Sequence, residues 1–569
     1  MELKELIDAA SGRIENDLLL TNGRVVNVWT GEILNVPIAI RKGVITALEA
    51  LPAKETVDLE GRFVSPGFID SHVHLESAMV TPAQYARAVV PRGTTAVVAD
   101  PHEIANVLGA DGVRNLLSWT AGLPLDVFVM APSCVPATPL ETSGATLTGG
   151  DLEALYDNPA VLGLAEMMNF PGVLAGIPEV LEKIAGAKNG RVDGHAPGLS
   201  GSGLSAYIAA GIGSDHECFT AEEALEKIRK GMLVMIREGT AARNLDALLP
   251  LVRPENADRF AFCTDDRHPF DLIHEGHMDF IVRRAVQKGL DPALAVRLAS
   301  WNPARYFGLR DRGAVAPGFR ADLAVFDDFK SLSCRLVLKA GRVVAKDGAT
   351  AWDPGTTRAP VRTVPVSLTP PSSDAFRVRN EPGRRMRVIE VIPDQIVTSV
   401  SWETPASENG WAVPDTGRDL LKLAVVERHR GTGRVAVAFV RGFGFRRGAF
   451  ASSVAHDSHN FIVVGASDDD LAAAVRELIR MNGGLAAVEG GRVRESLPLP
   501  VAGLMTDAPL ESVAERLESL KKAGREMGCV LNDPFMQLSF LALPVIPELK
   551  LTDRGLVDVG RFDFVPLFD

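Results

Sequence analysis

The stretch PGFIDSHVHLE, residues 66–76, decides how the rest of the chain is ordered. An apolar run ends here in a polar cluster in which His72 and His74 stand two residues apart. Side chains two apart on a β-strand point to the same side, so both imidazoles can reach one metal ion. Imidazole is the commonest metal ligand among side chains. The stretch therefore predicts a strand with a metal site at its carboxyl end.

Beyond this strand, the middle of the chain alternates apolar strand-like runs with helix-like runs, a pattern typical of a parallel α/β arrangement. The predicted strands are residues 68–74, 95–100, 126–131, 161–166, 191–195, 211–215, 232–237 and 259–265. Eight strand–helix units in about 250 residues predict a (β/α)8 barrel of the TIM type. We expect the barrel to occupy residues 65–311.

Short β-rich segments flank the barrel on both sides. Asn-Gly and Lys-Gly pairs between β-branched runs are hairpin signals in the first of them, and a similar pattern returns at about residues 323–344. We expect residues 1–64 and 312–362 to come together as one small β-sandwich.

A segment rich in Pro, Thr and Ser, residues 363–374, indicates a linker. Beyond it, strand-like runs alternate with helical patterns, including a clear helix at 469–481. We expect residues 375–569 to form a C-terminal α+β domain. The predicted fold class is thus α/β, with a barrel, a sandwich and a third domain.

Composition limits the partners and the compartment. The 60 Lys and Arg residues are outnumbered by 72 Asp and Glu, which gives a net charge of −12. No basic excess is available for phosphates, which argues against a nucleic acid or an anionic membrane as partner. The five cysteines are far apart, and no apolar stretch approaches the roughly 20 residues of a membrane span. The charged N-terminus lacks the apolar core of a secretory signal. We expect a cytoplasmic protein.

In a parallel barrel the reacting groups follow the carboxyl ends of the strands. Here nearly every predicted strand ends in a metal-competent or ionisable side chain. The set that can hold two divalent ions around a shared carboxylate is His72, His74, Glu166, His195, His216 and Asp265. Water bound to such ions ionises near neutral pH and becomes a nucleophile.

The H-x-H pair after the first strand, the histidines after the fifth and sixth, and the aspartate after the eighth resemble the amidohydrolase superfamily of metal-dependent hydrolases. Many of its members carry a carboxylated lysine on the fourth strand that bridges two metals. The fourth strand here ends LAEMMNFPG, residues 164–172, without a lysine. Glu166 is therefore expected to be the bridge.

Further motifs resemble one branch of that superfamily, the bacterial adenine deaminases. These motifs are DPHEIANV at 100–107, DGHAPG at 193–198, SDHEC at 214–218 and REGTAARNL at 237–245, with ASSVAHDSHN at 451–460 similar to that family's additional domain. The resemblance implies hydrolysis of adenine to hypoxanthine and ammonia, a purine-salvage reaction, by a metal-activated hydroxide. It also implies two divalent metals per chain, manganese with iron or zinc as substitutes, and a homodimer or larger assembly.

The expected mechanism needs two proton transfers. Asp265 is expected to take a proton from the water and to deliver it to the departing amine, since one carboxylate can do both in sequence. Ring N1 must also gain a proton as C6 becomes tetrahedral, and the sequence leaves Glu103, His102 and Glu238 open as its source.

Two further features allow more than one interpretation. Arg237 and Arg243 are purine contacts by analogy with the family, but either can equally be a structural salt-bridge partner. The run His456-Asp457-Ser458-His459-Asn460 can bind metal, cap the barrel mouth or hold a turn together, and we favour a structural or capping role.

The closest alternative enzyme is a cyclic-amide hydrolase of the hydantoinase or dihydroorotase type, and the missing barrel lysine argues against it. A deaminase of a modified purine or a nucleoside is a second alternative. A non-catalytic scaffold is disfavoured, because all six expected ligand positions carry ligand-competent side chains.

Overall fold

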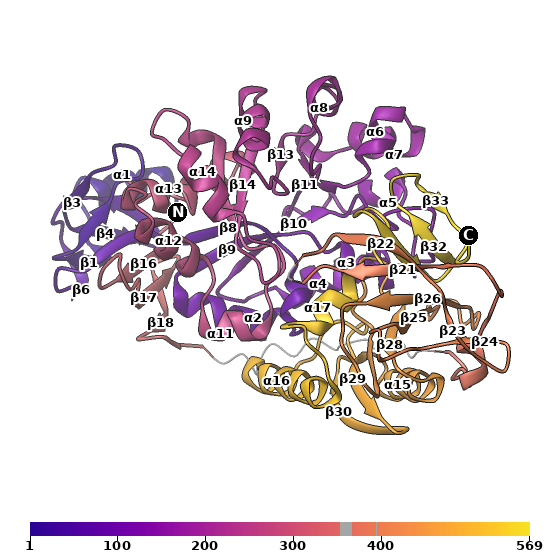
Figure 1. Ribbon diagram of the computed structural model, residues 1–569. Helices are drawn as coiled ribbons and strands as arrows, with labels where there is room; N and C mark the ends of the chain where they lie inside the picture. Colours follow the sequence, from indigo (N-terminus) through magenta and orange to yellow (C-terminus); the bar gives the residue numbers. More distant parts are fainter. Residues whose placement is uncertain (353–366, 394) are drawn as a thin grey trace.

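The computed structural model describes residues 1–352, 367–393 and 395–569. Its centre is the predicted barrel of parallel strands (Figure 1). The strands are β8 (Phe68–Val73), β9 (Thr94–Ala99), β10 (Asp126–Ala131), β11 (Val161–Met167), β12 (Val192–Gly194), β13 (Ser214–Asp215), β14 (Leu233–Arg237) and β15 (Phe260–Cys263). Parallel bridges between Val192 and Ile212 and between Val73 and Asp265 join its two sheets into a ring. Each predicted strand overlaps one of these, so the (β/α)8 prediction is confirmed.

The strands are apolar on both faces because each is covered on both. In β9, Ala96 and Val98 pack inside the barrel, whereas Val97 and Ala99 belong to the apolar layer beneath the helices. The helices are α2 (Pro82–Val89), α3 (His102–Leu108), α4 (Ala110–Trp119), α5 (Gly149–Glu153), α6 (Phe170–Ala175), α7 (Pro178–Ala185), α8 (Gly201–Ala209), α9 (Ala221–Arg229), α10 (Leu245–Leu248), α11 (Pro269–His274), α12 (Met278–Gln287), α13 (Pro292–Leu298) and α14 (Trp301–Phe307).

Two sheets made from both flanking segments pack beside the barrel. One contains β1 (Asn16–Thr21), β4 (Ile38–Arg41), β5 (Val44–Ala47) and β6 (Ala53–Asp58), with α1 (Leu3–Ala10) nearby. The other contains β2 (Arg24–Val26), β3 (Ile33–Asn35), β7 (Phe63–Pro66), β16 (Leu323–Phe326), β17 (Cys334–Lys339), β18 (Arg342–Lys346) and β19 (Ala349–Thr350). The segments meet where β7 pairs with β16, with Val64 opposite Val325.

The exact residues at which one domain gives way to the next stay a prediction. Residues 353–362 of the expected sandwich segment and residues 363–366 of the expected linker lie outside the described residues.

The C-terminal part is built on one large, mostly antiparallel sheet. In spatial order its strands are β22 (Thr398–Glu403), β21 (Met386–Val391), β26 (Val435–Arg441), β25 (Leu421–Val426), β28 (Phe461–Gly465), β27 (Ala449–Ser452), β29 (Gly484–Glu489) and β30 (Arg492–Pro498). Helices α15 (Asp468–Met481), α16 (Leu510–Met527) and α17 (Pro534–Phe540) pack against it, and the smaller strands are β20 (Val378–Arg379), β23 (Ala406–Glu408), β24 (Trp411–Val413), β31 (Leu549–Thr552), β32 (Gly555–Asp558) and β33 (Asp563–Phe564).

Helix α15 confirms the helix predicted in this region. The Ser467 side chain caps its first turn by accepting from the Asp470 N–H. Three aspartates in that turn match the positive end of the helix dipole. The helix ends at Asn482, which has the left-handed conformation common at helix ends.

The C-terminal domain covers the carboxyl end of the barrel (Figure 1). Backbone hydrogen bonds join Thr506 to Met79 and Thr81, which follow β8. The Thr552 hydroxyl donates to the Leu140 carbonyl at 2.7 Å, and the Asn460 amide donates to the Thr142 carbonyl at 2.8 Å. The end of the barrel where reacting groups were predicted is therefore in contact with the last third of the chain.

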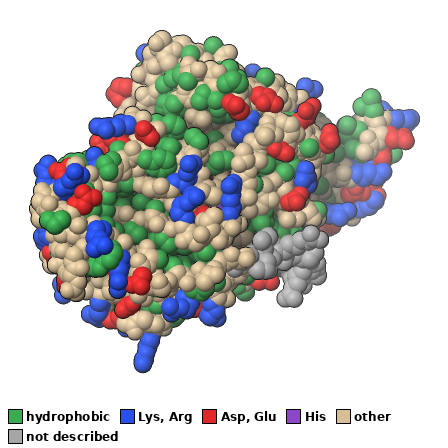
Figure 2. All heavy atoms as spheres, turned by 90° about the vertical axis from the view of Figure 1, so that its right-hand side faces the viewer, with side chains coloured by type: hydrophobic (Ala, Val, Ile, Leu, Met, Phe, Trp, Pro, Cys, Tyr) green, Lys and Arg blue, Asp and Glu red, His purple; other side chains and the backbone are tan. Residues whose placement is uncertain are grey.

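The surface charge and the helix lengths relate to the expectation that neither a nucleic acid nor a membrane is a partner. On the face in Figure 2, Lys and Arg side chains are interspersed with Asp and Glu side chains. Within the described residues, none of the helices combines the length and apolar character that crossing a membrane requires.

Lys339 joins the sandwich to the barrel. Its ammonium donates to Asp126 at 2.7 Å and to Asp322 at 2.8 Å, and its side chain is 6% exposed. Arg320 also pairs with both carboxylates, so each keeps a cationic partner when Lys339 is removed. We expect Lys339→Met to lower the free energy of unfolding by about 2 kcal/mol, because the buried Asp322 and the half-buried Asp126 lose a charged hydrogen bond. Urea denaturation followed by tryptophan fluorescence measures the loss.

Lys54→Met is the matched control. Lys54 pairs with Asp17 at 2.8 Å on the sandwich surface, where both side chains are largely solvated. Its removal should change stability by less than about 1 kcal/mol. Equal losses in the two variants would contradict a buried role for Lys339.

Candidate active site

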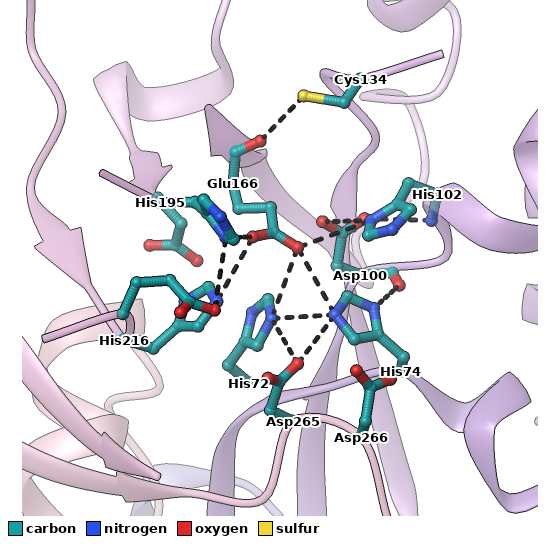
Figure 3. Close-up of polar contacts among 12 residues, drawn as sticks. His72, His74, Asp100, His102, Cys134, Glu166, His195, His216, Asp265 and Asp266 are labelled. Atoms are coloured by element: carbon teal, nitrogen blue, oxygen red, sulfur yellow. Dashed lines mark hydrogen bonds and ion pairs between the residues drawn. The ribbon is translucent and has the colours of Figure 1, made fainter. Parts of the chain in front are cut away.

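The six side chains expected from the sequence to bind metal meet at the carboxyl end of the barrel (Figure 3). They are His72 from β8, His74 directly after β8, Glu166 from β11, His195 after β12, His216 after β13 and Asp265 after β15. All six are buried. The structure thus brings together residues separated by almost 200 positions in the chain.

Glu166 lies between two pairs of imidazoles. Its Oε1 is 3.4 Å from His74 Nε2 and 3.7 Å from His72 Nε2. Its Oε2 is 2.7 Å from His195 Nδ1 and 3.3 Å from His216 Nε2. Each carboxylate oxygen therefore faces a different pair, which is the geometry of a carboxylate shared between two binding positions.

Asp265 completes the first position. Its Oδ1 is 3.0 Å from His74 Nε2 and 3.7 Å from His72 Nε2, and its Oδ2 is held by the Arg237 guanidinium. The residue has a φ of 59°, in the left-handed region that aspartate tolerates better than most residues. A bond from its N–H to the His72 carbonyl, at 2.9 Å, holds the backbone in this conformation.

The donor set fits a divalent cation. The Nδ1 of His74 is 3.0 Å from the Asp100 carbonyl, and since a carbonyl only accepts, Nδ1 carries the proton. The lone pair of Nε2 therefore faces the cluster, as in a metal-ligating histidine. Ligands about 2 Å from one ion lie roughly 3–3.5 Å apart, and the Nε2 atoms of His72 and His74 are 3.2 Å apart.

The electrostatics keep the carboxylates ionised. Burial acts to raise the pKa of Glu166, but His195 and His216 outweigh it and hold that pKa well below its usual range. Burial likewise opposes ionisation of Asp265, and Arg237 and His74 hold its pKa low. Burial, together with the charge of His216, lowers the pKa of His72. Burial acts to lower the pKa of His216, but Glu166 and Asp265 raise it to about 9. A divalent cation that binds His216 would therefore displace a proton from it.

A buried network supports β8 from behind. Asp70 accepts from the Thr264 N–H at 3.0 Å and lies 3.0 Å from His277 Nε2, which ties the first strand of the barrel to the last. The N–H of His72 is 3.3 Å from the same Asp70 carboxylate. Asp70 therefore positions the backbone from which the two histidines project.

Arg237 lines the cavity, but two carboxylates take up its guanidinium. One terminal nitrogen bonds both Glu217 and Asp265, and the other donates to Glu217 Oε2 at 2.9 Å. Its Nε–H is the part with no hydrogen-bond partner among the described residues. Glu217 directly follows His216 in the sequence.

Two predicted residues do not lie in the cavity. The Glu238 carboxylate accepts from the Arg284 guanidinium at 2.7 Å and from the Leu245 N–H at 3.2 Å. Arg243 pairs with Glu275 at 3.1 Å and is partly exposed. Neither side chain belongs to the set that lines the cavity.

His102 and Glu103, by contrast, both line the cavity. The Nδ1 of His102 is 3.1 Å from Asp100 Oδ2. Glu103 is fully buried, its Oε1 is 3.2 Å from His456 Nδ1, and neither of its oxygens has a hydrogen bond of normal geometry among the described residues. Burial acts to lower the pKa of His456, but the nearby Glu103 carboxylate outweighs burial and raises that pKa to about 9.

The cavity above the six residues is also lined from the C-terminal side. The described residues that the C-terminal part contributes are Ile396, His456, Asp457, Phe540, Leu543 and Ile546. We call the four apolar ones, Ile396, Phe540, Leu543 and Ile546, the roof residues. Their role could not be predicted from the sequence, because apolar side chains that line a cavity look the same there as those of an ordinary core.

Lys550 holds two roof residues in place. Its buried ammonium donates to the Ile396 carbonyl at 2.8 Å and to the Phe540 carbonyl at 3.0 Å. Burial lowers the pKa of Lys550 to about 7. Hydrogen bonds from Lys550 therefore fix the backbone at two of the four roof residues.

Known proteins match the chain along its whole length. Residues 63–345 match the amidohydrolase family model, and residues 395–563 match the model of the adenine deaminase C-terminal domain. An adenine deaminase of Desulfatibacillum aliphaticivorans is 52% identical over 567 residues, 99% of each chain. An adenine deaminase of Methanothrix thermoacetophila is 50% identical over 571 residues, 100% of each chain. A crystal structure of an adenine deaminase is 21% identical, with a TM-score of 0.45, and covers 58% of this chain and 99% of that one.

We expect Glu166→Gln to reduce the bound divalent metal to less than about half, because an amide cannot replace a carboxylate shared between two positions. Metal analysis by inductively coupled plasma spectrometry measures the content without reference to activity. Glu238→Gln, a buried glutamate outside the cavity, is the control and should keep its metal. Full metal content in Glu166→Gln would remove Glu166 from the ligands.

Proposed function

The chain belongs to the amidohydrolase family and, within it, to the adenine deaminases, and from this premise we propose that it hydrolyses adenine to hypoxanthine and ammonia, as a step of purine salvage. The observation that carries the proposal is the Glu166 carboxylate between two pairs of imidazoles, at the base of a cavity. By the same likeness we propose that the protein acts in the cytoplasm as a homodimer or larger assembly.

The family depends on metal, and the described residues include buried groups that fit a cation. We propose two divalent ions per chain, with His72, His74 and Asp265 holding one, His195 and His216 the other, and Glu166 shared between them. Manganese fits, as do iron and zinc, since this donor set does not discriminate strongly among them. When bound, the ions would lower the pKa of a water and so supply the nucleophile that attacks C6.

Asp265 is suited to move a proton between the water and the leaving amine. Its Oδ1 faces the cluster, whereas Arg237 holds its Oδ2 and fixes the plane of the carboxylate. In this proposal Oδ1 accepts a proton from the attacking water and then gives it to the amine nitrogen, so that ammonia departs. Arg237 acts through Asp265, since its terminal nitrogens are already engaged.

Glu103 is best placed to protonate N1. Its carboxylate lies in the cavity without a normal hydrogen bond, whereas Glu238 lies outside and is paired with Arg284. Glu103 is ionised at rest beside protonated His456, whose pKa is about 9, so the proton that Glu103 passes to N1 comes from His456. The C6 hydroxyl loses its proton as the carbonyl forms and ammonia leaves, and that proton restores His456. In net terms, the two protons of the water end on N1 and on the amine. His102 stays the alternative source, because it also lines the cavity.

The roof residues keep bulk water away from the reacting atoms. Phe540 and Ile546 form one apolar cluster, against which Ala241 of the barrel packs. A closed, apolar cover strengthens the electrostatic interactions beneath it and prevents loss of protons to solvent. Arg243, which lies outside the cavity, is not part of the proposed purine site.

The direct test is ammonia release by metal-loaded protein. We expect release from adenine and none from hydantoin or dihydroorotate, because the bridging position carries Glu166 and the site lacks the lysine of cyclic-amide hydrolases. Failure to release ammonia from adenine, with metal content verified, would overturn the proposed function.

Glu103→Gln tests the source of the N1 proton. We expect kcat to fall by about 10²- to 10⁴-fold, the usual contribution of a positioned acid, while the metal content stays unchanged. Glu141→Gln is the control: this buried glutamate lies outside the cavity, and burial raises its pKa well above its ordinary value, so the amide replaces a neutral acid. An unchanged kcat in Glu103→Gln would shift the role to His102.

A further inference from the structure

Asp457 belongs to the C-terminal domain, yet its carboxylate lines the cavity. The residue is 2% exposed, and its Oδ2 has no hydrogen-bond partner among the described residues. Its Oδ1 is 3.7 Å from both His102 Nε2 and His456 Nδ1, which is beyond normal hydrogen-bond distance. A buried acceptor without a partner is destabilising, so a ligand that donates to it would be favoured at this position.

The loop that carries Asp457 is held from several sides. The His456 N–H donates to the Ser539 carbonyl at 3.1 Å, and the His456 ring stacks on Phe540 with centroids 4.4 Å apart. The Asn460 amide bonds the barrel loop at Thr142. The carboxylate is therefore fixed before any ligand arrives, which reduces the entropy lost on binding.

The place of Asp457 in the cavity matches one end of a purine. The His102 ring lies between Glu166 and Asp457, with Nδ1 3.6 Å from Glu166 Oε1 and Nε2 toward Asp457. Asp457 is thus about one ring farther from the metal centre than His102. In adenine the amine-bearing carbon is on the six-membered ring, and the ring N–H is at the opposite end, on the five-membered ring. With C6 at the metal centre, that N–H points away from it.

We propose that Asp457 accepts a hydrogen bond from the N–H of the five-membered ring and thereby selects the free base over nucleosides and other N-substituted adenines. The proposal rests on the proposed function. An ionised carboxylate only accepts hydrogen bonds, so a purine whose ring nitrogen carries a sugar leaves it unpaired. Sites that bond a substrate N–H reject analogues without it far more strongly than apolar pockets do.

The experiment uses the metal-loaded full chain with Asp457→Asn and Asp457→Ala, and compares adenine with 9-methyladenine, which lacks the N–H. Asparagine keeps the shape but replaces the ionised carboxylate by a neutral amide. We expect kcat/KM for adenine to fall by about 10- to 100-fold in both variants, mainly through KM, as for loss of a charge-assisted hydrogen bond. The ratio of kcat/KM for adenine to kcat/KM for 9-methyladenine should also fall in both variants.

Asp553→Asn is the matched control, because Asp553 is equally buried at the same domain boundary, accepts from the Thr142 N–H at 2.8 Å and does not line the cavity. Its preference for adenine should equal that of the unsubstituted chain. An unchanged preference in both Asp457 variants would overturn the proposal, as would loss of metal, or a fall in kcat with KM unchanged. If the unsubstituted chain releases no ammonia from adenine, the proposed function itself fails, which is a separate outcome.

Discussion

The active site depends on one buried charge, the Glu166 carboxylate, and on the four imidazoles around it. Burying a lone carboxylate costs several kcal/mol, and such a group is tolerated only when partners surround it. Those partners come from β8 and from the ends of β12 and β13, so the charge is compensated only when the barrel is closed with the strands in register. The groups that would hold metal are therefore also part of what specifies the fold at this end of the barrel.

Much of the barrel could be predicted because parallel strands covered on both faces are short, continuous apolar runs. The strand at residues 211–215 shows the limit of that signal. Strand β13 begins only at Ser214, although Ile212 already bridges Val192, and Gly211 has a φ of 108°, outside the extended region. The H-x-H spacing carried more information, since the two-residue period of a strand fixes which side chains share a face.

The two-residue period of a strand also explains why, of two neighbouring residues predicted for the site, one lies in the cavity and the other outside it. Arg237 and Glu238 are adjacent on and after β14, and successive side chains point to opposite sides. Arg237 faces the cavity, and Glu238 turns toward Arg284. The roof residues could not be predicted in this way. Ile396 and Phe540 are far apart in the chain, and their apolar side chains carry no local mark that distinguishes a cavity wall from a core.

Protonated imidazoles balance part of the negative charge that lines the cavity. Six of the described lining residues carry carboxyl groups, namely Glu103, Glu166, Glu217, Asp265, Asp266 and Asp457. Arg237 supplies one positive charge, and His216 and His456, each with a pKa of about 9, supply two more. Burial opposes protonation of His74, but the carboxylates around it raise its pKa well above the ordinary range. A cation bound at His74 or His216 would release a proton, so bound metal would replace positive charge that protons already supply.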